Sequence, residues 1–342
     1  MNIALFAFTA AGRDTARGLR ERLAAGGDAG EVFVPAKLEA EDCAVYVGSL
    51  AAFVGRLFGR DALIFVGACG IAVRAIAPHV ASKASDPAVL CVDEKARFVI
   101  PILSGHIGGA NRLAHRLSRV LGATPVITTA TDVNGKFSVD AWAAERDMHI
   151  SSMPLAKRVS AEILTRDIPF CGDAPRPAAL PNGLFWGETG ELGICVSTRE
   201  RAPFEHTLLL IPRVLRVGIG CRRGVPAERI QAAVDRVFTS CRLSPHAVAG
   251  AASIDIKADE AGLLEFCAAR GWPIRFYSAQ ALEAVQGSAS VSEFVKKTVG
   301  VDNVCERAAL AGGGRLIAPK TALDGVTVAV AEMEWGIEFG QD

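Results

Sequence analysis

One stretch of the chain joins a titratable side chain to a run of glycines. Residues 103–111 read Leu-Ser-Gly-His-Ile-Gly-Gly-Ala-Asn and lead into an amphipathic helix expected over 110–121. Glycines weaken a helix start, so three of them here favour a close approach of the backbone to a ligand. His106 suits proton transfer near neutral pH. A helix-capping Ser104 beside a hydrogen-bonded histidine would explain the same residues without a ligand.

Two adjacent carboxylates, Asp93 and Glu94, follow the apolar run 88–92. Successive residues of a strand face opposite ways, so only one of the two can point into a given pocket. A carboxylate at a strand end can act as a general base or orient a histidine. The alternative is that both residues begin a polar turn. We therefore treat His106, Ser104, Asp93 and Glu94 as the candidate catalytic residues.

A second glycine-containing turn follows the apolar run 62–66, where Gly67-Ala-Cys-Gly70 precedes a helix that carries Arg74. A strand, two glycines and a helix in this order leave backbone N–H groups free at the carboxyl edge of a sheet, where anions bind. A tight strand-to-helix turn accounts for the pattern equally well. The third glycine of a dinucleotide-binding fingerprint is missing.

A similar turn lies further along the chain, where residues 218–224 read Gly-Ile-Gly-Cys-Arg-Arg-Gly between a strand and a helix. Arg222 and Arg223 can each hold a carboxylate through two parallel hydrogen bonds. Because Arg223 occupies the place of the third fingerprint glycine, the turn favours a carboxylate-rich ligand over a dinucleotide. The stretches 252–257 and 319–321 add further polar groups, and we expect the latter in a solvated loop.

Several common catalytic and metal-binding patterns are absent from the sequence. Ser104 does not lie in a Gly-x-Ser-x-Gly elbow, and neither His-Glu-x-x-His nor Gly-x-x-x-x-Gly-Lys-Ser/Thr occurs. The nine cysteines form no Cys-x-x-Cys pair, so we predict no zinc or iron–sulfur site. Scattered cysteines in an odd number fit a reducing cytosol.

The elements that must position these residues follow an α/β pattern, in which short apolar runs alternate with amphipathic stretches of helix length. We predict an α/β domain over 1–134, a small middle domain over 135–212 with a Pro-rich turn at 169–181, and a separate α/β domain over 213–342. Strands are expected at 3–8, 62–66, 89–92, 98–102, 124–128, 184–186, 192–196, 207–211, 215–219, 273–276 and 326–330. Helices are expected at 12–23, 110–121, 226–238, 259–269 and 291–297.

The composition of the 342-residue chain excludes some classes of partner. Lys plus Arg and Asp plus Glu number 37 each, so the formal net charge is zero and no basic block marks a nucleic-acid surface. The longest apolar run, 62–73, is well short of the roughly 20 residues that span a bilayer. The N-terminus begins as a strand without a basic signal region. We therefore expect a cytoplasmic protein that binds neither nucleic acid nor membrane.

Taken in series, these motifs resemble one known family. They occur in the order 67–74, 86–94, 104–111, 128–137, 218–224, 252–257 and 319–321. Their order and spacing closely resemble the cobalt-precorrin 5A hydrolase family of anaerobic cobalamin biosynthesis, known as CbiG. The resemblance covers essentially the whole chain. Its C-terminal motifs are similar to a domain that also occurs as a separate protein in the aerobic pathway.

The resemblance implies a hydrolase that acts on cobalt-precorrin 5A. Members of the family open the δ-lactone of the ring A acetate and expel C20 with its methyl group as acetaldehyde, which gives cobalt-precorrin 5B. No organic cofactor or protein-bound metal is implied, because the cobalt arrives within the corrinoid substrate. A homodimer and transient contacts with other corrin-pathway enzymes are compatible with this role.

This chemistry needs an activated water, a stabilised oxyanion and cations for the acetate and propionate side chains of the substrate. Our hypothesis makes His106 the general base, oriented by Asp93 or Glu94. The backbone N–H groups of residues 108–110 would stabilise the oxyanion. The expected substrate contacts are Gly67, Gly70, Arg74, Lys83, Gly108, Gly109, Asn111, Asp132, Lys136, Arg222 and Arg223.

Two other functions stay open at this point. A corrin-pathway methyltransferase would share the substrate, but it needs a nucleoside-binding pocket, and the sequence contains no recognisable one. A corrinoid carrier would bind an unstable intermediate and hand it on without consuming water or releasing a fragment. The C-terminal domain would suit such a carrier.

Overall fold

The computed structural model describes residues 1–82, 85–285 and 303–339. Its contacts divide the chain into two compact units, Met1–Glu145 and Arg146–Asp342. The predicted α/β class is confirmed. Lys83 and the helix expected at 291–297 lie outside the described residues. Within the described ranges, no helix is both long and apolar enough to cross a membrane.

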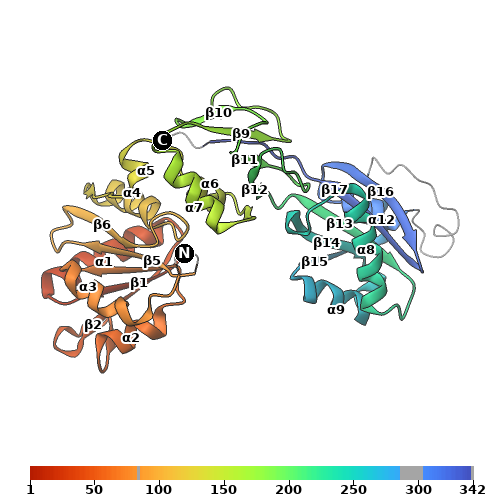
Figure 1. Cartoon of the computed structure of the whole chain (residues 1–342). Helices are drawn as coiled ribbons and strands as arrows, with labels where there is room; N and C mark the ends of the chain where they lie inside the picture. The colour runs from red at the N-terminus through yellow and green to blue at the C-terminus, as the bar shows by residue number, and fades with distance from the viewer. Residues whose placement is uncertain (83–84, 286–302, 340–342) are drawn as a thin grey trace. The chain divides into compact units, whose positions relative to one another are not determined.

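The described strands of the first unit form a seven-stranded sheet in the order β3-β2-β1-β4-β5-β6-β7 (Figure 1). They are β1 (Asn2–Ala7), β2 (Ala29–Pro35), β3 (Ala44–Tyr46), β4 (Ala62–Val66), β5 (Ala88–Val92), β6 (Phe98–Leu103) and β7 (Thr124–Pro125). Strands β1 to β5 are parallel, β6 is antiparallel to β5, and β7 is parallel to β6. Strands β4 and β5 are buried at every position, as expected for inner strands of a parallel sheet.

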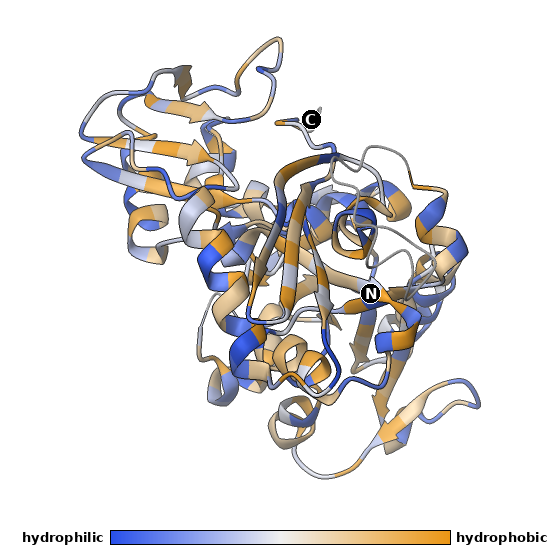
Figure 2. Ribbon diagram, turned by 90° about the vertical axis from the view of Figure 1, so that its right-hand side faces the viewer, coloured by the Kyte–Doolittle hydropathy of each residue, from blue (hydrophilic) through white to orange (hydrophobic). Residues whose placement is uncertain are grey.

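Helices cover both faces of this sheet. They include α1 (Ala10–Ala25), α2 (Leu50–Leu57), α3 (Cys69–Ile76) and α4 (Ala110–Leu121). Because side chains alternate along β1, Leu5 packs with Leu19 of α1 and Leu117 of α4 on one face. Phe6 faces the other way, toward α2 and α3, and stacks on Phe65 with ring centroids 4.8 Å apart. In Figure 2 the strands are largely orange, whereas the helices alternate between orange and blue.

The reversal of direction at β6 decides where the predicted site residues lie. Strands β5 and β6 pair with Val92 opposite Val99 and Val89 opposite Leu103. The turn at 93–97 therefore lies at the carboxyl edge of the parallel strands, and the loop after Leu103 lies at the opposite edge. At about 3.3 Å per residue, the length of β5 separates these two edges by roughly 15 Å.

The predicted elements of the first unit are largely confirmed. The helix expected at 110–121 is α4, and Gly122 ends it in the left-handed conformation with φ 68°. The strand expected at 124–128 is shorter, because β7 pairs only with β6 and the chain then enters α5 (Ala130–Val133). The prediction missed β2, β3 and α2. These elements lie toward one edge of the sheet, and their partly exposed residues interrupt the apolar pattern.

The described strands of the second unit form two five-stranded sheets, β10-β9-β11-β12-β8 and β15-β14-β13-β17-β16. The first contains β8 (His149–Ile150), β9 (Ile168–Gly172), β10 (Leu184–Trp186), β11 (Leu192–Val196) and β12 (His206–Ile211). The second contains β13 (Leu215–Cys221), β14 (Val248–Ile254), β15 (Ile274–Tyr277), β16 (Arg315–Leu323) and β17 (Val326–Glu332). Its helices include α8 (Ala227–Cys241), α9 (Ala261–Arg270) and α12 (Val304–Leu310).

The Pro-rich turn predicted at 169–181 is wrong in its first part, because β9 runs through Pro169. The N–H of Ile168 donates to Gly183 O on one side of β9, and β11 pairs with β9 only from Phe170 onward. Pro169 comes before the first residue of β9 that pairs with β11. Its missing N–H therefore removes no hydrogen bond from the sheet.

The solvated loop predicted at 319–321 is also wrong, because these residues belong to β16. Strand β16 pairs with β17 in a hairpin that turns at Asp324 and Gly325. The pairing shifts register between Ala318 and Thr321, and Pro319 lies within this irregular segment. A proline inside a short polar stretch is typical of loops, so the local pattern indicated the wrong structure.

Gly218 lies where β13 contacts α12. A Cβ atom at this position would lie 1.8 Å from Cys305 O and 2.7 Å from Ala309 N. Both are backbone atoms of the helix, which cannot move aside as a flexible side chain can. The first glycine of the predicted ligand-binding turn is therefore required for close packing of a helix on a strand.

We expect Gly218→Ala to lower the free energy of unfolding by about 2 kcal/mol or more, because the added methyl group overpacks against backbone atoms. Thermal unfolding followed by circular dichroism measures the change. Gly336→Ala is the control, since no heavy atom of the described residues, apart from its chain neighbours, lies within 4 Å of its added Cβ. Equal unfolding midpoints for the two variants and the parent chain would contradict the close packing.

Candidate functional site

His106 lies between two carboxylates of the first unit. Its Nε2 atom is 2.9 Å from Asp132 Oδ2, and its Nδ1 atom is 3.1 Å from Asp140 Oδ1. Thr131 Oγ1 lies 3.3 Å from Nε2. The side chain of Asp140 is 4% exposed, that of His106 is 18% exposed and that of Asp132 is 33% exposed. The cluster therefore has a buried end at Asp140 and an open end at Asp132.

Three segments after β6, one loop and two short helices, bring these side chains together. The loop before α4 carries His106, α5 carries Asp132, and the first turn of α6 (Val139–Glu145) carries Asp140. Because β6 and β7 are parallel, the segments that follow them reach the same edge of the sheet. The backbone N–H of Lys136 donates to Thr131 O at 2.8 Å, so this predicted contact residue belongs to the same turn as Asp132.

Neighbouring polar side chains hold Asp132 in place. Asn111 Nδ2 donates to Thr129 Oγ1 at 2.8 Å and to Asp132 Oδ2 at 3.3 Å, and the Thr129 hydroxyl donates to the same oxygen. With His106, three side chains therefore contact Oδ2. Within the part of the chain that the structure describes, no donor contacts Asp132 Oδ1. This oxygen can accept a proton or a hydrogen bond from a bound molecule.

The two carboxylates change the protonation of His106. The hydrogen bond to Asp132, followed by that to Asp140, raises the pKa of His106 to about 9, although burial of the ring opposes this. The hydrogen bond from His106 lowers the pKa of Asp132, again against the effect of burial. At neutral pH the imidazole is therefore a cation, with a proton on each ring nitrogen. Such a cation donates a proton, so the predicted role of general base does not fit this resting arrangement.

The glycine-rich loop folds tightly against the start of α4. Ser104 has a left-handed backbone with φ 57°, and its buried Oγ has no hydrogen-bond partner among the described residues. A Cβ atom on Gly108 would lie 2.4 Å from Ser104 Cβ, so this position requires glycine. Gly109 is the N-cap residue of α4, so the Ser104 side chain does not cap the helix.

The oxyanion site predicted at residues 108–110 needs correction. The N–H of Gly109 donates to His106 O at 2.9 Å, and the N–H of Ala110 donates to Ser104 O at 3.0 Å. Both groups are used within the loop, so neither is available to an oxyanion in this conformation. The ring nitrogens of His106 are also used in this conformation, by Asp132 and Asp140, so the imidazole can donate to an oxyanion only when its Nε2–H leaves Asp132.

Asp93 and Glu94 do not orient the histidine, because they lie at the opposite edge of the sheet. The Asp93 carboxylate accepts hydrogen bonds from the N–H groups of Arg97 and Phe98, both at 2.7 Å, and so closes the turn from β5 to β6. Burial raises the pKa of Asp93, but these backbone hydrogen bonds outweigh burial and hold it below the ordinary value. Glu94 accepts the Thr9 hydroxyl at 2.8 Å, beside the start of α1.

The other predicted contacts near the first glycine turn also lie away from the histidine cluster. Gly67, Gly70 and Arg74 follow β4 at the carboxyl edge of the sheet. Arg74 Nη1 donates to Gly70 O at 3.1 Å within α3. The structure therefore does not bring these residues to His106, and their role in binding stays a prediction.

The sequence prediction missed Asp140 and Thr129. Asp140 is an acidic residue on the buried face of α6, between apolar neighbours at Val139 and Trp142. A buried carboxylate needs a partner, so this position was a usable signal. The signal could not identify His106 as that partner, because the two residues are distant in the sequence. Thr129 lies in a run of similar hydroxyl residues and carries no such signal.

The predicted arginines of the second unit line a cavity of about 670 Å³ at the carboxyl ends of β13 and β14. Lys257 and Lys320, from the two other polar stretches of this region, line the same cavity. Arg223 pairs with Asp259 at 3.1 Å, and both side chains are exposed. The fold therefore collects Arg222, Arg223 and two lysines at one place.

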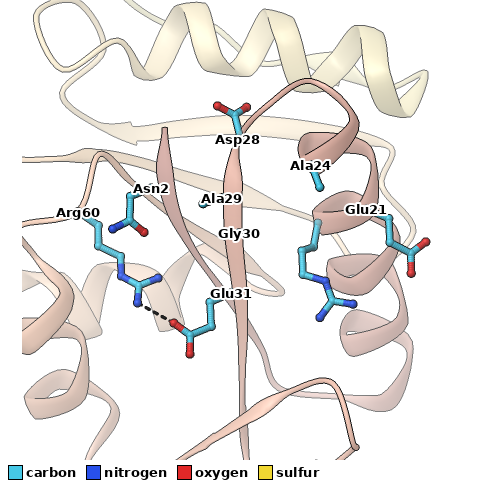
Figure 3. Close-up of a pocket in the computed structure, with 9 residues that line it drawn as sticks. Asn2, Glu21, Ala24, Asp28, Ala29, Gly30, Glu31 and Arg60 are labelled. Carbon is cyan, nitrogen blue, oxygen red and sulfur yellow. Dashed lines mark hydrogen bonds and ion pairs between the residues drawn. The ribbon is translucent and has the colours of Figure 1, made fainter.

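A further hollow of about 440 Å³ at the amino ends of β1 and β2 contains none of the predicted site residues (Figure 3). Arg60 Nη2, from the segment before β4, lies 2.7 Å from Glu31 Oε2 of β2, and Figure 3 marks this pair with a dashed line. Arg20, which also lines the hollow, pairs with Asp42 at 2.7 Å. Both cations already have carboxylate partners, so neither is free to bind an anion.

We expect nuclear magnetic resonance titration of the imidazole carbon-bound protons to give a pKa near 9 for His106. Asp140→Asn should lower this pKa, because it removes a carboxylate that stabilises the cation. Glu145→Gln, an exposed change on the same helix, is the matched control. A pKa near the ordinary histidine value in the parent chain, or no effect of Asp140→Asn, would contradict the cluster.

Comparison with known proteins shows which family the chain resembles. Residues 52–132 match the family model described as cobalamin synthesis G N-terminal, and residues 215–331 match cobalamin synthesis G C-terminus. The chain is 34% identical to the cobalt-precorrin-5A hydrolase of Salmonella typhimurium, over 96% of this chain and 97% of that protein. It is 32% identical to the protein of the same name from Priestia megaterium, over 84% and 83%. A solved cobalamin biosynthesis protein G homolog from Sulfolobus solfataricus is 24% identical over 97% of both chains, with a TM-score of 0.43. The resemblance noted from the motifs is therefore confirmed, and the chain belongs to the cobalamin synthesis G family.

Proposed function

We propose that this chain hydrolyses cobalt-precorrin 5A, opening its δ-lactone, releasing acetaldehyde and leaving cobalt-precorrin 5B. Two relatives that match most of the chain carry the name cobalt-precorrin-5A hydrolase, which supports the substrate. The observation that carries the reaction is the cluster in which the imidazolium of His106 lies beside the partly exposed carboxylate of Asp132. Such a pair can both accept and donate protons during hydrolysis.

In the first step, water attacks the lactone carbonyl carbon. Asp132 Oδ1 accepts a proton from the water as the new carbon–oxygen bond forms. The Nε2–H of the protonated His106 turns from Asp132 Oδ2 to the substrate, where it stabilises the negative charge on the tetrahedral intermediate. It then passes to the lactone ring oxygen as that carbon–oxygen bond breaks. This step leaves a free acetate side chain and a hydroxyl group on C20.

In the second step, a carbon–carbon bond of C20 breaks. The neutral imidazole of His106 removes the hydroxyl proton, the oxygen becomes the carbonyl oxygen of acetaldehyde, and the electron pair of the broken bond stays on the macrocycle. His106 therefore acts as an acid first and as the predicted base second. Asp140 holds the ring through Nδ1 at the buried end and acts as a positioning residue.

The proposal includes no resident cofactor, because the cobalt enters within the substrate. It keeps the expectation of a cytoplasmic protein and of a homodimer with transient contacts to other corrin-pathway enzymes. The buried Ser104 is not needed for either step, and its hydroxyl, which has no hydrogen-bond partner among the described residues, stays without an assigned role.

We expect the purified chain, incubated anaerobically with cobalt-precorrin 5A, to release acetaldehyde in a one-to-one ratio to the corrinoid consumed. Alcohol dehydrogenase and NADH measure the acetaldehyde, and mass spectrometry measures the matching change in the corrinoid. His106→Ala should lower kcat by about 10²- to 10⁴-fold, because it removes the acid and base of both steps.

His115→Ala is the control for this experiment, since His115 lies on the exposed face of α4. An unchanged rate for His106→Ala at saturating substrate would exclude the proposed role of His106. A parent chain that releases no acetaldehyde but retains the coloured corrinoid through gel filtration would favour a carrier over a hydrolase.

The pH dependence of kcat/KM separates an acid-first from a base-first mechanism. Because the pKa of His106 is raised to about 9, its protonated form persists up to that pH and is lost above it. If ring opening limits the rate, kcat/KM should fall as the pH rises through about 9. Asp140→Asn should move this fall to lower pH. A rate that instead increases through pH 9 would show that the neutral imidazole starts the reaction.

A further inference from the structure

The cavity of the second unit lies where open α/β sheets usually bind ligands. Strand β13 leads through α8 to the parallel strand β14 on one side, and the antiparallel strand β17 lies on its other side. The cavity is lined by Gly220 and Cys221 at the end of β13, by Arg222 and Arg223 directly after it, and by Ile254, Ile256 and Lys257 around the end of β14. Crevices at the carboxyl ends of parallel strands are common ligand sites of this architecture. Its volume of about 670 Å³ suits a small organic molecule.

The described lining of this cavity carries four cationic side chains and one carboxylate, that of Asp324. Lys257 Nζ pairs with Glu260 Oε2 at 3.1 Å. The side chains of Arg222 and Lys320 form no ion pair or hydrogen bond with any described residue. These two unpaired cations give the cavity an excess of positive charge.

The backbone holds this part of the cavity in a fixed shape. Glu260 Oε1 accepts the N–H of Gly224 at 2.6 Å, which ties the turn after β13 to the start of α9. The backbone N–H of Arg222 donates to Gly325 O at 2.9 Å, and the N–H of Lys320 donates to the buried Glu306 at 2.8 Å. Both unpaired cations therefore extend from anchored backbone.

The cavity also has an apolar wall. Ile254, Val304, Leu323 and Val326 line it, and Ile254 and Val304 belong to one buried cluster. Apolar walls with a few charged groups favour a ligand that is itself apolar with charged substituents. A corrin macrocycle with acetate and propionate side chains has this character, whereas a free inorganic anion does not.

We propose that this cavity is a second corrinoid contact, in which Arg222 and Lys320 bind carboxylate side chains of the macrocycle. The choice of a corrinoid as ligand rests on the proposed function, but the site itself is distinct from the His106 cluster. Arg222 presents a planar fork to one carboxylate, and Lys320 offers a compact ammonium group to the same or a neighbouring one. Lys257 is paired with Glu260 and instead stabilises the turn.

Binding of dicyanocobyrinic acid to the full-length chain tests this proposal without any turnover. All acetate and propionate side chains of this stable corrinoid are free carboxylates, whereas dicyanocobinamide presents them as amides. Equilibrium dialysis with detection by absorbance should show tighter binding of the acid, weakened by added salt. The variant R222Q/K320Q should bind the acid at least about tenfold more weakly, because two charge-assisted contacts are lost.

Two control variants make the outcome specific. Arg236→Gln removes an exposed cation on α8 that does not line the cavity, and it should leave binding unchanged. The charge-conserving variant R222K/K320R should keep most of the binding, which separates loss of charge from loss of fold. Equal binding of the acid by R222Q/K320Q and the parent chain, or equal binding of the acid and the amide, would overturn the proposal.

Two separate measurements distinguish this inference from the proposed hydrolase activity. Acetaldehyde release by the parent chain tests the hydrolase, and the binding of dicyanocobyrinic acid by R222Q/K320Q tests the second contact. Charge-dependent binding without acetaldehyde release would overturn the hydrolase proposal alone. Acetaldehyde release with binding that ignores Arg222 and Lys320 would overturn the second contact alone.

Discussion

The antiparallel pairing of β6 with β5 is the constraint on which the first unit depends. Five parallel strands place their carboxyl ends at one edge of the sheet, and the turn closed by Asp93 sends the chain back to the other edge. Strand β7 then follows β6 in parallel, so the segments after both strands meet. The histidine cluster is assembled from those segments. The glycine turn after β4 stays at the carboxyl edge together with Asp93, and the N–H of Gly67 donates to Val92 O at 2.8 Å.

Charge balance explains how the cluster combines stability with reactivity. One imidazole between two carboxylates leaves a net negative site when His106 is protonated, and each carboxylate stabilises that proton. The buried Asp140 needs the cation, because an unpaired carboxylate in an apolar surrounding is costly. Asp132 has hydrogen-bond donors on Oδ2 and leaves Oδ1 open to the outside. The arrangement therefore orders the ring at its buried end and exposes a proton-accepting oxygen at the other.

Each unit contains a glycine that is required because another part of the chain packs directly against it. Gly108 is required because the loop before α4 passes against Ser104, and Gly218 is required because α12 packs directly on β13. Neither glycine needs a ligand to explain it. In the second unit, packing of α12 supplies one wall of the cavity beside the unpaired Arg222. The same helix therefore packs closely on β13 and forms part of the cavity wall.

The sequence by itself determined the α/β class, most inner strands, the bounds of α4 and the family, because apolar periodicity and short motifs are local properties of the chain. It also predicted His106 as a catalytic residue and Asn111 and Asp132 as substrate contacts, without showing that the three side chains lie together. Only the tertiary structure decided that Asp132 and Asp140, and not Asp93, contact the histidine. That choice depends on the direction of β6, which is set by its pairing with β5 and by the turn that Asp93 closes, and not by any residue of the motif around His106. The protonation of His106 follows from the same long-range contacts, so no reading of the isolated motif could have given it.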